Sequence, residues 1–170
     1  MKKLILVTIL AVFAFTSCGQ KPEQKEEVST YYLIRHAEKD VSDKTNRNPK
    51  LTEIGLQRAE NWAKHFKAVK FDMVYSTDYF RTKQTAMPTA IANNVELQFY
   101  NPSDMQIEAF MSNTKGKTVL IVGHSNTTPM FTNGLLGEEK YEQIPEDNNS
   151  NLYVVKITKD SKSSELSVVD

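Results

Sequence analysis

The chain of 170 residues is long enough for one domain with a hydrophobic core of its own. Its 21 lysines and arginines balance 21 aspartates and glutamates, so the net charge does not favour nucleic acid or an anionic membrane surface as a partner. A single cysteine, Cys18, excludes an intramolecular disulfide and a metal cluster built from cysteines.

The N-terminal segment has the pattern of a secretory signal. A basic start, Met1–Lys3, precedes an apolar run over 4–15 that only Thr8 interrupts. This run is shorter than the ~20 apolar residues that a transmembrane helix needs. Small residues lead directly into Cys18, so residues 1–17 resemble a bacterial lipoprotein signal. We expect Cys18 to be lipidated and to become the mature N-terminus; a plain secretory signal and an uncleaved anchor are the alternatives.

A polar, charged stretch follows the signal. Residues 18–29 lack hydrophobic periodicity and predict a flexible tether, so that the folded domain spans residues 30–170. Lipid chains on Cys18 would hold this domain at a membrane. The sequence therefore predicts an exported bacterial lipoprotein on the periplasmic or cell-surface face of a membrane.

The first elements of the domain are a strand and an amphipathic helix. The run YYLIRHAEK, 31–39, begins with apolar, β-forming residues and ends in charged ones, as a buried strand does where it reaches a sheet edge. A helix is predicted over 52–66, with Thr52 as its N-cap. The helical spacing indicates a core-facing stripe of apolar residues: Ile54, Leu56, Ala59, Trp62, Ala63 and Phe66.

Strand and helix patterns alternate through the rest of the domain. Pro88 is expected to end or kink the helix in which it lies. Further strands are predicted at 71–76, 95–100, 117–123, 152–157 and 164–168, and further helices at 80–92, 102–116 and 127–136. This order predicts an α/β domain with a mostly parallel central sheet that is flanked by helices on both faces.

Cations and imidazoles stand at or just after three of these strand ends. Arg35 and His36 end the first strand, Arg81 follows the second, and His124 follows the strand at 117–123. Open α/β sheets bind ligands beyond the carboxyl ends of their strands. Guanidinium groups match phosphoryl oxygens, and a neutral imidazole can attack phosphorus. Two guanidinium charges would repel a divalent cation, so these residues predict a phosphoryl site rather than a metal site.

Four segments carry these residues and the helix start between them: LIRHAEK (33–39), LTEIGLQRA (51–59), YSTDYFRTKQTA (75–86) and VGHSN (122–126). In this order they resemble the RHG signature, the LTxxGxxQA helix start, the SSxxxRTxQTA segment and the second histidine motif of the histidine phosphatase superfamily, the phosphoglycerate mutase-like proteins. Ala37 stands in the place of the signature's glycine. The short chain is most similar to the small single-domain branch typified by phosphohistidine phosphatases, which implies a phosphoglycerate mutase-like fold.

The resemblance implies a role for each of these side chains. His36 would be the nucleophile that becomes phosphorylated, and water would then hydrolyse the phosphohistidine. Arg35, Arg81 and His124 would bind the phosphoryl oxygens and stabilise the charge that develops during transfer. No metal and no cofactor are implied, because the arginines take the place of a metal.

The proton donor is where the chain departs from the family pattern. Larger members carry a glutamate after the RTxQTA segment that protonates the leaving oxygen, and no acidic residue here aligns with it. The candidates, in order of preference, are Glu108, Asp104 and Glu38. An alkoxide leaving group needs a general acid, whereas a phosphohistidine, acyl phosphate or aryl phosphate leaves more easily. If no carboxylate points into the site, we expect substrates of the second kind.

The sequence thus predicts a metal-independent phosphatase that hydrolyses a phosphomonoester or phosphoramidate, either on a small phosphorylated substrate or on a phosphohistidine. A phosphoglycerate mutase-type phosphotransferase is the second reading. A lipoprotein that binds phosphorylated ligands without turnover is a third, and a metal-dependent hydrolase that uses the histidines is a fourth.

Overall fold

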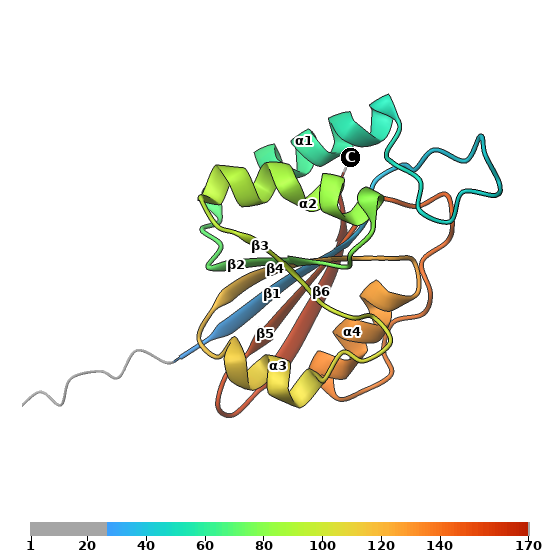
Figure 1. Cartoon of the computed structure of the whole chain (residues 1–170). Coiled ribbons are helices and arrows are strands. Elements are labelled where there is room, and N and C mark those ends of the chain that lie inside the picture. The colour runs from blue at the N-terminus through green and yellow to red at the C-terminus, as the bar shows by residue number, and fades with distance from the viewer. Residues whose placement is uncertain (1–26, 170) are drawn as a thin grey trace, which may run out of the picture.

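The computed structural model describes residues 27–169 (Figure 1). The predicted signal at 1–17, the lipidation site Cys18 and most of the predicted tether lie outside the described residues. The first strand begins at Ser29, one residue before the predicted start of the domain. No helix within residues 27–169 combines the length and apolar character needed to cross a membrane.

The core of the fold is a six-stranded sheet in the order β3-β2-β4-β1-β5-β6. The four strands β3, β2, β4 and β1 are parallel, β5 is antiparallel to β1, and β6 is antiparallel to β5. The strands are β1 (Ser29–Arg35), β2 (Met73–Ser76), β3 (Leu97–Phe99), β4 (Thr118–Gly123), β5 (Asn151–Ile157) and β6 (Lys162–Val168). The predicted α/β class with a mostly parallel sheet is confirmed.

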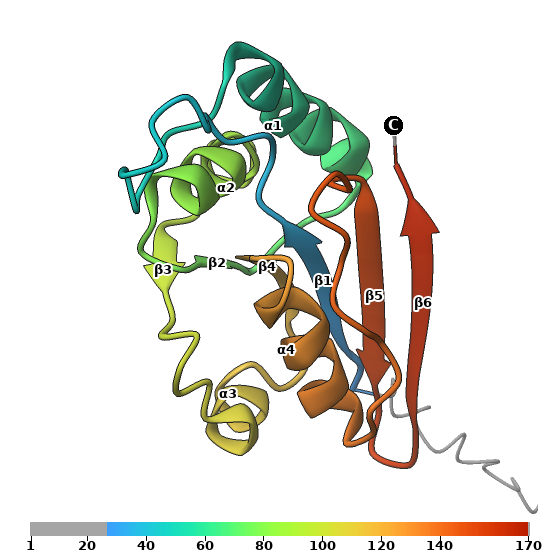
Figure 2. The same cartoon turned by 90° about the vertical axis from the view of Figure 1, so that its right-hand side faces the viewer.

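Helices cover both faces of the sheet. In Figures 1 and 2, α1 (Glu53–His65) and α2 (Phe80–Asn93) lie on one face, and α3 (Ile107–Asn113) and α4 (Thr127–Leu136) lie on the other. Strand β1 contributes to both apolar cores, because successive side chains of a strand point to opposite faces. Ile34 packs with Trp62 of α1, whereas Leu33 belongs to the cluster that contains Phe131 of α4.

Helix α1 begins as predicted but buries a different set of residues. Thr52 is the N-cap, and its Oγ1 accepts a hydrogen bond from the Gly55 amide at 3.1 Å. Ile54 and Leu56, both predicted to face the core, are 70% and 44% exposed. Gly55 takes the inner position between them, where it packs so closely on the backbone of Glu38 that a Cβ would overlap the Glu38 carbonyl oxygen. Without that contact in view, spacing alone favoured the larger apolar neighbours.

Helix α2 spans the predicted range 80–92 and one further residue without ending at Pro88, whereas helix α3 starts later than predicted. Helix α2 continues through Pro88 to Asn93, because a buried face that includes Ala86 and Ala90 packs it onto the domain and outweighs one lost backbone hydrogen bond. Helix α3 begins only at Ile107, because Asn101 forms a turn first: its side-chain oxygen accepts from the Ser103 amide and its carbonyl accepts from the Asp104 amide.

Candidate active site

Three neighbouring parallel strands bring the predicted residues to one edge of the sheet. In the register of the sheet, Arg35 of β1 lies opposite Gly123 of β4, and Ser76 of β2 lies opposite Val122 of β4. The residues that follow these strands, including His36 and His124, therefore emerge side by side.

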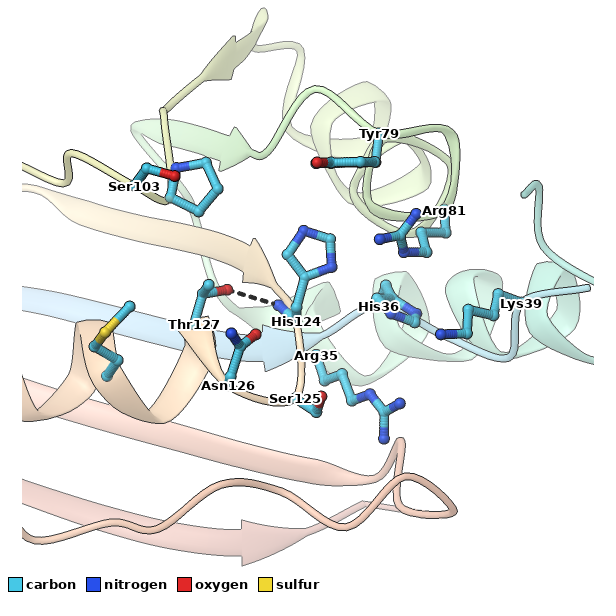
Figure 3. A pocket seen from close by; sticks show the side chains of 12 residues that line it. Arg35, His36, Lys39, Tyr79, Arg81, Ser103, His124, Ser125, Asn126 and Thr127 are labelled. Atoms are coloured by element: carbon cyan, nitrogen blue, oxygen red, sulfur yellow. Dashed lines mark hydrogen bonds between the residues drawn. The ribbon is translucent and has the colours of Figure 1, made fainter. Parts of the chain in front are cut away.

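These residues line one cavity of about 590 Å³ (Figure 3). The ring centroids of His36 and His124 lie 5.5 Å apart, with the ring planes inclined by 70°. Arg35 and Arg81, also predicted, are part of the lining. The other polar residues around the cavity are Lys39, Tyr79, Ser103, Ser125, Asn126 and Thr127. The structure thus brings together the two histidines and two arginines that the strand ends predicted.

His36 is held as a neutral imidazole with one free nitrogen. Its Nδ1 lies 2.7 Å from the carbonyl oxygen of Ala37, which can only accept, so Nδ1 carries the ring proton and Nε2 keeps a lone pair. Burial lowers the pKa of His36 to about 3; the Ala37 carbonyl opposes this shift, and the nearby His124, Arg35 and Arg81 add to it. The backbone is fixed as well, since the His36 amide donates to Gly123 O at 3.0 Å.

His124 is fixed by two threonines. Thr77 Oγ1 lies 2.9 Å from His124 Nε2, and the His124 amide donates to Thr127 Oγ1 at 3.0 Å. Burial lowers the pKa of His124 to about 4, with further lowering by Arg81 and Lys39 and by Arg35. Both imidazoles are therefore uncharged near neutral pH.

Arg81 presents hydrogen-bond donors to the cavity from the first turn of α2. Its guanidinium carbon lies 4.4 Å from the ring centroid of Tyr79, which fixes the group through a cation–π contact. Nε and Nη1 of Arg81 are buried and have no hydrogen-bond partner among residues 27–169. In Figure 3 the guanidinium lies close to the imidazoles. Buried donors that the protein leaves unused suit an anionic ligand that supplies the acceptors.

Arg35 is placed differently from Arg81. Its residue is only 2% exposed, and the guanidinium points away from the two imidazoles in Figure 3. Nη1 donates to the carbonyl oxygens of Pro145 at 2.7 Å and Asn148 at 2.9 Å, and Nη2 donates to Oε2 of Glu146 at 2.8 Å. Nε is buried without a partner in the described part of the chain. A phosphoryl group can therefore use Nε of Arg35 while a loop occupies the outer nitrogens.

None of the predicted proton donors lines this cavity. Glu108 is exposed on α3, the Asp104 side chain bonds to Gln106, and the Glu38 carboxylate accepts from Arg58 Nε at 2.8 and 3.0 Å. Among residues 27–169, no Asp or Glu belongs to the cavity lining. The same residues contain no group of three or more His, Cys, Asp or Glu side chains that could hold a metal ion.

Several residues around the site were not predicted from the sequence. Tyr79 and Thr77 lie inside the YSTDYFRTKQTA segment, where their nearness to Arg81 was a usable signal. Lys39 follows His36 by three residues. Glu146 and Asn149, whose Nδ2 donates to the His36 carbonyl at 2.7 Å, lie in the loop 137–150, which has no periodicity from which their position could be inferred.

Comparisons with known proteins concern the family and the fold. The model of the histidine phosphatase superfamily (branch 1) matches residues 31–102. The sequence has no match among curated proteins. Solved structures share the fold, with TM-scores of 0.65 for the protein histidine phosphatase SixA complexed with tungstate, 0.65 for a mycobacterial glucosyl-3-phosphoglycerate phosphatase complexed with VO3, and 0.61 for a phosphoglycerate mutase from Bacillus anthracis.

These three similarities extend over most of each chain at low sequence identity. SixA is 14% identical and the match covers 82% of this chain and 96% of SixA. The mycobacterial phosphatase is 12% identical, and the match covers 84% of this chain and 99% of that protein. The mutase is 15% identical, and the match covers 82% of this chain and 92% of that protein. The family model thus places residues 31–102 in the histidine phosphatase superfamily (branch 1), and the solved structures show that the domain shares the fold of phosphatases and of a phosphoglycerate mutase.

Proposed function

We propose that the protein is a metal-independent phosphatase that transfers the phosphoryl group of its substrate to His36 and then to water. One observation carries the proposal. A neutral imidazole with a free Nε2 shares a cavity with Arg81, whose buried Nε and Nη1 have no partner among the described residues. A nucleophile and unused anion-binding donors in one place are what phosphoryl transfer requires.

The first step forms a bond from His36 Nε2 to phosphorus. The lone pair of Nε2 attacks, the bond from phosphorus to the leaving oxygen or nitrogen breaks, and the leaving group takes that electron pair. Arg81 and Nε of Arg35 donate to the phosphoryl oxygens, and His124 lies beside them to bind a third. The Ala37 carbonyl keeps the His36 proton on Nδ1 throughout, so the imidazole is ready to attack without losing a proton first.

The second step releases the phosphate. A water oxygen bonds to phosphorus, the bond from phosphorus to Nε2 breaks, and the electron pair returns to the imidazole. The water gives its protons to the phosphate oxygens and to solvent, and the free His36 is restored. Three positively charged or hydrogen-bonding groups stabilise the phosphoryl oxygens in both steps, which is the main electrostatic demand of the reaction.

The lining of the cavity limits the substrates that we propose. No carboxylate within residues 27–169 lines this cavity, and the acidic residues of the adjoining pocket that also contains His36 include Glu38 and Glu146, which are bonded to Arg58 and Arg35; we therefore propose leaving groups that depart without protonation by a carboxylic acid. Phosphoramidates such as phosphohistidine, acyl phosphates and aryl phosphates meet this condition, whereas simple alkyl phosphates do so poorly. We therefore place phosphoramidates and activated phosphomonoesters before alkyl phosphomonoesters.

Two of the structural neighbours support the proposed phosphoryl site. SixA was solved with tungstate and the mycobacterial phosphatase with VO3, and both oxyanions resemble phosphate. Both of these neighbours are phosphatases, whereas the Bacillus anthracis neighbour is a phosphoglycerate mutase, so the mutase reading stays as the alternative to hydrolysis. Localisation is proposed on the sequence alone: an exported lipoprotein held at a membrane through Cys18.

Hydrolysis of p-nitrophenyl phosphate and acetyl phosphate by the domain from residue 27 onward tests the proposal. Activity in the presence of EDTA and its loss in His36→Ala, with a phosphorylated peptide spanning His36 recovered from wild-type enzyme quenched and digested at alkaline pH, would support it. If His36→Ala retained full activity, the nucleophile would be another group. If the wild type bound tungstate but turned over neither substrate, the protein would be a binding protein.

The proposed lipid anchor at Cys18 is tested separately. Metabolic labelling with a radioactive fatty acid should mark the full-length protein and leave Cys18→Ser unlabelled. A full-length protein that appears unlabelled in the soluble fraction would exclude the lipid anchor and leave the enzymatic proposal intact.

A further inference from the structure

The loop 137–150, which precedes β5, forms several hydrogen bonds to the end of β1. Arg35 donates to two backbone carbonyls of this loop, at Pro145 and Asn148, and to the Glu146 carboxylate, and Asn149 Nδ2 donates to the His36 carbonyl. The Ile144 amide also donates to Ser125 O at 2.9 Å, which ties the loop to the turn after β4. This loop therefore contacts both strand ends that carry the catalytic histidines.

Glu146 makes the one charged contact in this set. Its Oε2 lies 2.8 Å from Arg35 Nη2 and 4.0 Å from Lys39 Nζ, and its Oε1 accepts from Ser125 Oγ at 2.8 Å. The Ser125 hydrogen bond, with support from Arg35 and Lys39, lowers the pKa of the Glu146 carboxyl, so the group is ionised near neutral pH. The Arg35 side chain is 3% exposed and that of Glu146 is 66% exposed, so the carboxylate sits on the solvent side of a buried guanidinium.

We propose, on the basis of the function proposed above, that Glu146 is a positioning residue for the phosphoryl site. The two carbonyl oxygens hold only Nη1 of Arg35. The bond from Glu146 fixes Nη2 and with it the plane of the guanidinium, which sets the direction of the Nε–H that is left for a phosphoryl oxygen. Glu146 itself does not touch the substrate in this arrangement.

An opposite role is chemically conceivable and makes the opposite prediction. A carboxylate that bridges Arg35, Lys39 and Ser125 could act as an internal anion that substrate must displace. The structure favours positioning because the Arg35 guanidinium is buried and its Nη1 is bound to two backbone carbonyls, so it does not depend on the release of Glu146 to reach the cavity.

The experiment compares Glu146→Ala and Glu146→Gln with a control that removes a negative charge elsewhere on the same loop, Glu142→Gln. Glu142 is exposed. For each variant, kcat and KM for p-nitrophenyl phosphate, the dissociation constant of tungstate by calorimetry, and the melting temperature are measured. Glutamine at position 146 can still accept from Arg35 and donate to Ser125, so it tests geometry with the charge removed.

In Glu146→Ala we expect KM and the tungstate dissociation constant to rise together by about tenfold, the size expected for the loss of one charge-assisted hydrogen bond. Glu146→Gln should recover at least half of this loss on a logarithmic scale, and Glu142→Gln should match the wild type. A tighter dissociation constant in Glu146→Ala would show a competing anion and overturn the proposal. Unchanged constants, or a lower melting temperature alone, would overturn it too. An inactive wild type would instead refute the proposed function.

Discussion

Oγ1 of Thr77 lies 2.9 Å from Nε2 of His124, and Thr77 is fully buried. The hydroxyl is itself 2.9 Å from Oγ1 of Thr82, so the ring of His124 rests on a short chain of hydroxyl groups rather than on solvent. This contact fixes which way the ring faces. It gives His124 a defined orientation toward His36 before any ligand arrives.

Thr77→Val should therefore impair catalysis while leaving the shape of the side chain nearly unchanged. We expect kcat for p-nitrophenyl phosphate to fall about tenfold, because the imidazole loses its orienting hydrogen bond. Thr77→Ser keeps the hydroxyl and should retain most of the activity. Equal kcat values for the valine and serine variants would show that this contact does not orient His124.

Arg81 should be sensitive even to replacement by lysine. Its Nε and Nη1 form a planar pair of buried donors, which a lysine ammonium cannot reproduce. We expect Arg81→Ala to lower kcat/KM by about 10²–10³-fold, as for other donors to a developing anion, and Arg81→Lys to recover only part of that loss. Lys83→Ala, two residues further along α2 and outside the cavity lining, is the control for loss of a cation. The prediction fails if Arg81→Lys is as active as the wild type.

The two buried histidines should make the fold less stable in acid. Their pKa values of about 3 and about 4 in the folded protein lie below the value of about 6.5 expected in the unfolded chain. Below pH 6.5 the two histidines bind protons in the unfolded chain but stay neutral in the folded protein. The free energy of unfolding therefore falls as the pH falls from about 6.5 toward 4. Above pH 6.5 both states hold neutral imidazoles and this contribution disappears.

Urea denaturation at pH 7.5 and pH 5 measures this effect. The difference in free energy of unfolding between the two pH values should shrink in the double variant His36→Asn/His124→Asn. His65→Asn, an exposed histidine at the end of α1, serves as the control. A double variant with the same pH dependence as the wild type would contradict the assignment.

Gly55→Ala should destabilise the protein although alanine is the better helix former. The added Cβ would overlap the Glu38 carbonyl oxygen, so the helix or the segment after His36 must shift. We expect a loss of about 1–3 kcal/mol in the free energy of unfolding, the usual cost of overpacking. Leu56→Ala, at a position 44% exposed, should cost much less. A stabilised Gly55→Ala variant in urea titration would rule out this close contact.

The sequence was sufficient to predict the sheet and the meeting of His36, His124 and Arg81. Apolar, β-branched runs marked the strands, and charged residues at their ends marked the sheet edge. The parallel pairing of these strands predicts that the site residues meet, because the carboxyl ends of adjacent parallel strands lie at the same edge of the sheet.

Features that depend on contacts between distant segments were not predictable in this way. Gly55 and not Ile54 faces inward because of a backbone 17 positions earlier in the chain, at Glu38. Glu146 reaches Arg35 across 111 positions from a loop without periodicity. Glu108, the preferred proton donor, was chosen only because it lies in the stretch after the RTxQTA segment, and the structure leaves it exposed on α3.

Strand β1 would also determine how the domain faces a membrane if Cys18 carries the proposed lipid anchor. The strand starts at Ser29, whose Oγ accepts a hydrogen bond from the Gly116 amide at 2.8 Å, and ends at Arg35 beside the cavity. Seven residues of extended chain separate the two ends by about 20 Å. A lipid group at Cys18 would therefore pull on the pole of the domain opposite the cavity. The mouth of the site would open toward the aqueous compartment, within reach of dissolved molecules or of phosphorylated side chains on other proteins.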